Sequence, residues 1–227
     1  MDPGVTFLFR ERRYGSDVSQ PPVILIHGAA TTASVWERVV PLLDGLEVRA
    51  VERPCSGDLA TELRFLAPLV EGAIVVGVGG GATLGLALAS SEVRFVSALL
   101  HEPAVGSLAP ELLAPMAAAF ADGGVEAFGA RLYGPSWNRS LAPLDDAVVA
   151  RELGMFRGFE PQAAAAGRGA VLVTTGANSP TVRHEAASSL SAHLGYETSV
   201  LEGCAHFVHW DNPDVLASSI LAAAARG

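Results

Sequence analysis

The sequence predicts an α/β protein whose mostly parallel central sheet is covered by helices on both faces. Apolar runs at residues 23–26 and 74–78 are continuous rather than alternating, which is typical of strands buried on both faces. A cluster of glycines follows the second run and opens directly into a Leu- and Ala-rich stretch with helical spacing. Strands that alternate with helices along the chain in this way indicate a parallel sheet.

Composition excludes several classes of protein. Of the 227 residues, 50% are hydrophobic and 17% are charged, which indicates one well-buried globular domain. The net charge of −9 argues against a nucleic-acid partner. No apolar run approaches the ~20 residues that a membrane-spanning helix needs. The sequence opens on Asp2, Pro3 and Gly4 rather than on a basic and then apolar leader, so we expect a cytoplasmic location.

All 15 basic residues are arginine, so the chain contains no lysine. This excludes a Schiff base, the attachment of pyridoxal phosphate and the lysine of a P-loop. Cys55 and Cys204 lack the spacing of a disulfide framework or a zinc ribbon. Both are interpreted as small buried hydrophobes, with a place facing a cleft as the alternative for Cys55. We therefore expect no cofactor, no metal and a small-molecule partner, and the sequence leaves the oligomeric state open.

The first half of the chain supplies alternating elements. Ser34 and Glu37 have the spacing of a capping box, which predicts an amphipathic helix from Ser34 to about Leu43. The other predicted elements of this half are strands at residues 5–10, 23–26, 46–52, 74–78 and 96–100, and helices at residues 59–70 and 80–90.

The pattern changes after residue 103. Roughly sixty residues follow with helical periodicity and no convincing strand, interrupted by breaks such as Gly123, Gly124, Gly134 and Pro135. We interpret residues 104–167 as a helical cap, or lid, over the carboxyl edge of the sheet, and residues 1–103 and 168–227 as the core. Ordinary crossover helices are the alternative. The sheet then resumes with strands at residues 170–174 and 196–201 and a terminal helix after Asn212.

The glycine cluster admits two interpretations. Gly77, Gly79 and Gly81 fit the strand–turn–helix elbow Gly-x-Ser-x-Gly with glycine in place of the serine. Gly77, Gly79 and Ala82 also fit the dinucleotide-binding pattern Gly-x-Gly-x-x-Gly/Ala. A dinucleotide-binding fold, however, normally carries its glycines after the first strand, and it gives no reason for a Gly-x-x-His near the carboxyl end.

Along nearly its whole length the chain resembles the α/β-hydrolase superfamily. The matching pieces, in order, are Ile26–His27–Gly28, the glycine elbow, His101–Glu102–Pro103, the turn at Gly176, and Gly203 to Phe207. The resemblance implies an α/β-hydrolase fold with a lid insertion. It also implies a nucleophilic serine at position 79 and an acid near Ser179, and both are absent from this sequence.

The resemblance places the family's general base at His206. Glu102, after the strand that follows the elbow helix, would orient it as the acid does in triads, and Asn178 is a weaker substitute. The alternatives are a histidine retained for packing and a solvated carboxylate at position 102. The same resemblance places an oxyanion hole at the amides of Ala29 and Gly80. Five further residues are expected to line the pocket: His27, Gly28, Trp36, Asn178 and Ser179.

Two functions remain open. The first is an enzyme without serine chemistry, in which His206 acts as general acid/base on a small, largely apolar carbonyl compound. Cyclisation, elimination, isomerisation, decarboxylation and water-mediated hydrolysis all suit such a site. The second is a non-catalytic relative that binds a small molecule or a partner protein in the same pocket.

Overall fold

The computed structural model describes residues 20–143 and 145–226, so the strand expected at residues 5–10 lies outside the described part. Its centre is a six-stranded sheet with the order β2-β1-β3-β4-β5-β6, and every pairing is parallel. The predicted α/β class with a mostly parallel sheet is confirmed. The strands are β1 (Val23–Ile26), β2 (Val48–Val51), β3 (Ile74–Val78), β4 (Ser97–His101), β5 (Ala170–Gly176) and β6 (Glu197–Leu201).

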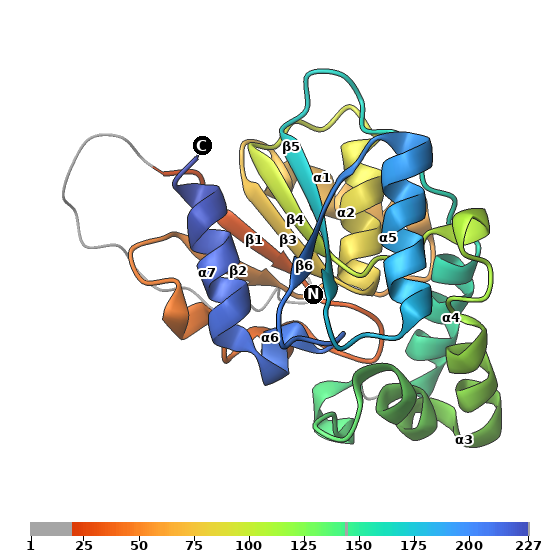
Figure 1. Cartoon of the computed structure of the whole chain (residues 1–227). Helices are drawn as coiled ribbons and strands as arrows, with labels where there is room; N and C mark the ends of the chain where they lie inside the picture. Colours follow the sequence, from red (N-terminus) through yellow and green to blue (C-terminus); the bar gives the residue numbers. More distant parts are fainter. Residues whose placement is uncertain (1–19, 144, 227) are drawn as a thin grey trace.

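Helices cover both faces of this sheet. Every residue of β1 and β3 is buried, as their continuous apolar sequences predict. Figure 1 shows α7 on one face of the sheet and α1, α2 and α5 on the other. These helices are α1 (Leu59–Val70), α2 (Gly80–Ala89), α5 (Thr181–Leu194) and α7 (Pro213–Ala224), and the short α6 (Val208–Asp211) precedes α7.

The helix predicted from Ser34 to Leu43 is wrong. This stretch forms two short 3-10 helices instead, η1 (Ala33–Trp36) and η2 (Val40–Leu42). Ser34 lies inside η1, where its hydroxyl bonds the Thr32 hydroxyl at 2.7 Å rather than capping a helix. Pro41 has no N–H to donate, and its ring would clash with the carbonyl one turn earlier, so an α-helix cannot run through this position.

The helical segment of residues 104–167 joins β4 to β5. It contains η3 (Gly106–Leu108), α3 (Ala114–Tyr133), η4 (Arg139–Leu141) and α4 (Asp146–Arg157), and its described residues include no strand. Figure 1 shows α3 and α4 gathered at one end of the sheet. The backbone of α3 leaves helical geometry at Gly123 (φ −149°, ψ 23°) and Gly124 (φ 63°, ψ −148°). The treatment of this segment as a separate cap stays a prediction.

Limited proteolysis is expected to cut the folded protein first at Gly123–Gly124. Gly123 is exposed and the backbone is already non-helical there, so little structure is lost when a protease binds. The first fragments, identified by mass spectrometry, should end at this break. First cleavage inside α2 or α5 would contradict the expectation.

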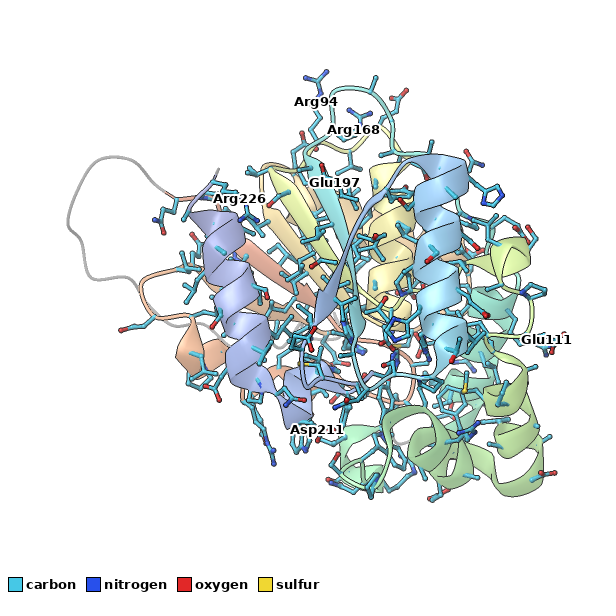
Figure 2. All side chains as sticks on the ribbon, in the orientation of Figure 1. Arg94, Glu111, Arg168, Glu197, Asp211 and Arg226 are labelled. Carbon is cyan, nitrogen blue, oxygen red and sulfur yellow. The ribbon has the colours of Figure 1, made fainter. Side chains whose placement is uncertain are left out.

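The surface carries many of the charges. Labelled charged side chains such as Arg94, Glu111 and Arg226 project from the periphery of the molecule (Figure 2). Among the described residues, no helix is long and apolar enough to cross a membrane.

Candidate active site

The site is organised around the turn between β3 and α2. Gly79, at its apex, has φ 57° and ψ −116°, a conformation that costs a residue with a side chain strain energy. Its neighbours allow a close backbone approach, because a methyl group added to Gly81 would lie 1.9 Å from the carbonyl oxygen of Ile26. The strand, sharp turn and helix are the parts of a nucleophile elbow, and here its apex has no side chain.

A histidine and a carboxylate meet beside this apex. His206 follows β6 and Glu102 follows β4, so parallel pairing brings both to the carboxyl edge of the sheet. The His206 Nδ1 atom lies 2.8 Å from the Glu102 Oε2 atom, and both side chains are buried. Because a carboxylate only accepts, Nδ1 carries the proton and Nε2 carries the lone pair.

The second imidazole nitrogen faces the apex. A methyl group added to Gly79 would lie 2.9 Å from His206 Nε2. This buried nitrogen has no hydrogen-bond partner among the described residues. A buried polar atom without a partner costs free energy. Five other buried side-chain atoms of the described residues share this state, and His206 Nε2 is the one among them that faces the elbow apex.

Glu102 is also held by Gly176, Ser179 and Arg183. Its Oε1 atom accepts hydrogen bonds from the Gly176 amide, at 2.9 Å, and from the Ser179 hydroxyl. The Arg183 Nε atom lies 3.3 Å from Glu102 Oε2, and Arg183 Nη1 donates to the Glu102 carbonyl oxygen at 3.1 Å. Burial alone would raise the pKa of the Glu102 carboxyl. The hydrogen bond to His206 and the nearby positive charges outweigh burial and hold that pKa well below its usual value.

The imidazole is neutral at physiological pH. Burial disfavours its charged form, and the Arg183 cation acts in the same direction. The hydrogen bond and negative charge of Glu102 offset these effects only in part, so the pKa of His206 is lowered to about 4. A neutral imidazole with an unprotonated, inward-facing nitrogen can accept a proton.

The lowered pKa of His206 predicts that the protein loses stability as the pH falls from about 6.5 to about 4. In this window the unfolded chain binds a proton at this position and the folded chain does not, so the free energy of unfolding decreases. The share of His206 is about 3 kcal/mol. Burial also lowers the pKa values of His27, His101 and His209, which add to the effect with the same sign.

Denaturant unfolding at several pH values measures this loss. Comparing the wild type with His206→Gln isolates the contribution of His206, because the other five histidines remain. Equal pH slopes for the two proteins between pH 6.5 and 4 would contradict a neutral, buried His206.

Two backbone amides lie close to the apex. A methyl group added to Gly80 would be 3.2 Å from the Ala29 nitrogen, so the Gly80 and Ala29 amides are near neighbours. The described hydrogen bonds give neither amide an acceptor. Gly80 also begins α2, where the helix dipole favours negative charge.

A small, mostly apolar pocket adjoins these groups. Its volume of about 30 Å³ is enough for about one water molecule. Beside the predicted residues, it is lined by Arg183 and by apolar side chains of the helical segment. The lining residues are Ala29, Gly79, Gly80, Thr83, Glu102, Ala104, Leu113, Phe128, Leu132, Leu153, Phe156, Arg183 and His206.

Five residues expected in the pocket do not line it, which corrects the prediction. Asn178 is exposed and donates from Nδ2 to the Gly203 carbonyl at 3.0 Å, so it does not orient His206. The Ser179 hydroxyl donates a hydrogen bond to the Glu102 carboxylate. The Trp36 ring packs against His209 with the ring centroids 4.8 Å apart.

His27 and Gly28 lie behind the pocket wall. Arg53, which is buried, donates to the His27 carbonyl at 3.0 Å and to the Gly28 carbonyl at 3.2 Å. A methyl group added to Gly28 would lie 3.0 Å from the Tyr133 hydroxyl.

A buried charge cluster joins the helical segment to the core, and the sequence did not reveal it. Arg53 donates to Glu62 at 3.0 Å and to Glu152 of α4 at 2.5 Å, and the three side chains are fully buried. Cys55 lies in the same region, and burial raises the pKa of its thiol to about 12. The thiol is therefore protonated at neutral pH, as expected for a small buried residue rather than a nucleophile.

Tyr133 and Arg183 are the other site residues that the sequence did not reveal. The Tyr133 ring stacks on the His206 ring with centroids 5.5 Å apart, and its hydroxyl donates to the Ala29 carbonyl at 2.6 Å. Arg183 stands in the first turn of α5, just after the turn where the family's acid is expected, and that position was the available signal.

Three solved structures illustrate the similarity to known proteins. The MenH protein of S. aureus has a TM-score of 0.72 and 13% identity, over 97% of this chain and 98% of that one. The enol-lactonase of Burkholderia xenovorans LB400 has a TM-score of 0.71 and 18% identity, over 96% and 95%. A lipase-esterase related protein of Clostridium acetobutylicum ATCC 824 has a TM-score of 0.75 and 10% identity, over 96% and 98%.

No curated protein sequence matches the chain significantly. The model of the alpha/beta hydrolase family matches residues 23–219, a range that runs from β1 into α7 and includes Gly79, Glu102 and His206. The parallel sheet, the glycine elbow between β3 and α2, and this match lead to one conclusion: the chain belongs to the α/β-hydrolase family.

Proposed function

We propose that the protein is an enzyme in which His206 acts as a general base on a small carbonyl compound, without a covalent intermediate at position 79. The observation that carries this proposal is the buried His206 Nε2 atom, which has no partner among the described residues and faces the apex of the elbow. A glycine cannot form an acyl-enzyme, so the histidine must act on the substrate or on a water molecule.

Glu102 is the residue that orients the base. Its carboxylate fixes the tautomer of His206 through Nδ1 and stabilises the imidazolium that forms when Nε2 takes a proton. Arg183 acts through Glu102, since it keeps this carboxylate ionised and in place. An ion pair thus connects Arg183 to Glu102, and a hydrogen bond connects Glu102 to His206.

The Ala29 and Gly80 amides form the oxyanion hole of this proposal. Removal of a proton next to a carbonyl group places negative charge on the carbonyl oxygen, as does attack of water on it. Two amides that find no acceptor in the described part of the chain, one of them at a helix N-terminus, are suited to stabilise either charge. The mostly apolar lining of the pocket favours a largely apolar compound. The name of one structural neighbour, an enol-lactonase, is compatible with a carbonyl substrate.

Deuterium exchange tests the proposal without a known substrate. The protein is incubated in D₂O with a panel of small ketones, 2-oxo acids, esters and lactones, and NMR follows both the exchange of protons next to the carbonyl and hydrolysis. We expect catalysed exchange or turnover of at least one compound, and its loss in His206→Gln. Activity on the panel that is unchanged in His206→Gln contradicts the proposal.

A non-catalytic binding protein is the second candidate. The aromatic ring of Phe156 favours it, because a methyl group added to Gly80 would lie 2.6 Å from that ring, so the ring packs closely against Gly80 and narrows the space beside the apex. Under this function His206→Ala would weaken ligand binding by about 1–3 kcal/mol, the cost of losing a buried hydrogen-bond partner, and no compound of the panel would be turned over.

A further inference from the structure

A second cavity lies next to the site. Its volume is about 290 Å³, and it is formed by the chain after β4 and the carboxyl end of α4. Three residues line both spaces: Ala104, Leu113 and Phe156. These side chains therefore form the partition between the two.

The sizes of the two spaces are very unequal. The pocket at Gly79 offers about 30 Å³, which a carbonyl group can use but a whole substrate cannot. The second cavity, about 290 Å³, is close to the lower end of the volumes found for small-molecule sites, roughly 300–1,000 Å³. A compound whose carbonyl group reaches the Ala29 and Gly80 amides needs room beyond this pocket, and the second cavity is the neighbouring space that shares part of its lining.

Phe156 is the part of the partition that contacts the elbow. Its ring lies against Gly80, where a methyl group would be 2.6 Å from the ring carbons, and it also lines the second cavity. Rotation of the ring toward that larger space would move it away from Gly80. A side chain can make such a movement without displacing the helix that carries it.

The lining of the second cavity indicates the kind of ligand. Its lining includes the apolar residues Val105, Ala109 and Leu112. Polar side chains also line it, and the Glu160 carboxylate accepts from the Ser107 amide at 3.1 Å and from the Ser107 hydroxyl at 2.7 Å. Arg157 is a further polar residue of the lining. A hydrocarbon arm of medium length with a polar end fits such a lining.

We propose that the second cavity binds the hydrocarbon arm of an elongated carbonyl compound, and that Phe156 is the gate between this arm and the carbonyl site. The proposal rests on the proposed function for the place of the carbonyl group. The arm site itself is tested by binding alone, so it can fail or succeed separately from catalysis.

Straight-chain methyl ketones from 2-butanone to 2-nonanone are suitable probes, with dissociation constants measured by NMR titration of the folded protein. Each methylene that enters the cavity should tighten binding about fourfold, the effect of burying one CH₂ group. Ala109 lines only the second cavity, so a tryptophan at this position should fill that cavity. Ala109→Trp should therefore remove the dependence of affinity on chain length and leave the affinity for 2-butanone unchanged. Pro110→Trp is a second variant that fills the cavity, at a more exposed position.

The matched control is Ala118→Trp. Ala118 is an exposed residue of α3 that lines neither cavity, so this substitution should not change the ketone affinities. The dependence on length should persist in His206→Ala even if that variant shows that the catalytic proposal is wrong. Phe156→Leu should speed ketone association several-fold, whereas Phe159→Leu, a buried residue that lines neither cavity, should not. Absence of ketone binding, length dependence that survives both filling variants, or equal association rates for Phe156→Leu and wild type would overturn the proposal.

Discussion

Replacing His206 with alanine is expected to reduce turnover by about 10²–10⁴-fold, the usual contribution of a positioned general acid/base. The neutral imidazole, with Nδ1 held 2.8 Å from Glu102 and Nε2 facing Gly79, is the group placed to accept a proton in this pocket. Steady-state rates with whichever compound of the carbonyl panel is turned over give the size of the loss.

Asn178→Ala is the matched control for this experiment. Asn178 lies in the neighbouring loop and was a candidate to orient His206, but its side chain bonds the Gly203 carbonyl and not the imidazole. Its replacement should leave the rate unchanged. Circular dichroism and the unfolding midpoint of both variants would show that the fold is retained. An active protein that is indifferent to His206→Ala would end the catalytic proposal.

Gly79→Ser is expected to convert the site into one that reacts with a fluorophosphonate probe, whereas the wild type should remain unlabelled. The backbone at position 79 already has the φ of 57° that a nucleophile elbow requires. The added Cβ would lie 2.9 Å from His206 Nε2, so the imidazole must shift by a few tenths of an ångström, after which the serine hydroxyl has a base beside it. The strained backbone costs the variant about 1–3 kcal/mol of stability.

Mass spectrometry measures the fraction of Gly79→Ser protein that carries the probe. Gly79→Ala carries the same strain without a nucleophile and should stay unlabelled. The double variant Gly79→Ser with His206→Ala should react far more slowly than the single one, because its serine lacks a base. A folded Gly79→Ser protein that does not react would contradict the placement of His206 beside the apex, and stoichiometric labelling of the wild type would contradict a reaction without serine.

The sheet could be predicted from the sequence because its strands are local signals. β1 and β3 are continuous apolar runs, and the close approach at Gly81 explains why the elbow tolerates only glycine there. The helix expected from Ser34 was wrong because the capping-box pattern was given more weight than Pro41, which cannot take part in an α-helix at that point.

The candidate site was only partly predictable. Gly79, Glu102 and His206 each end a strand or follow one, so their order along a known topology brings them together. Arg183 and Phe156 reach the site from the sides of helices, and their direction depends on how those helices pack. The two carboxylates that pair with Arg53 are 9 and 99 residues away in the chain, and no local pattern reveals that the three meet.

Nitrogen-15 NMR of the histidine rings tests the central claim, that His206 is a neutral base with its free nitrogen turned toward the elbow. At pH 7 the account predicts a proton on Nδ1, shared with Glu102, and none on Nε2, with a titration midpoint at a pKa of about 4. Assignment by comparison with His206→Gln identifies the signal. A midpoint near 6.5, the ordinary histidine value, or a proton on Nε2 at pH 7 would contradict the account.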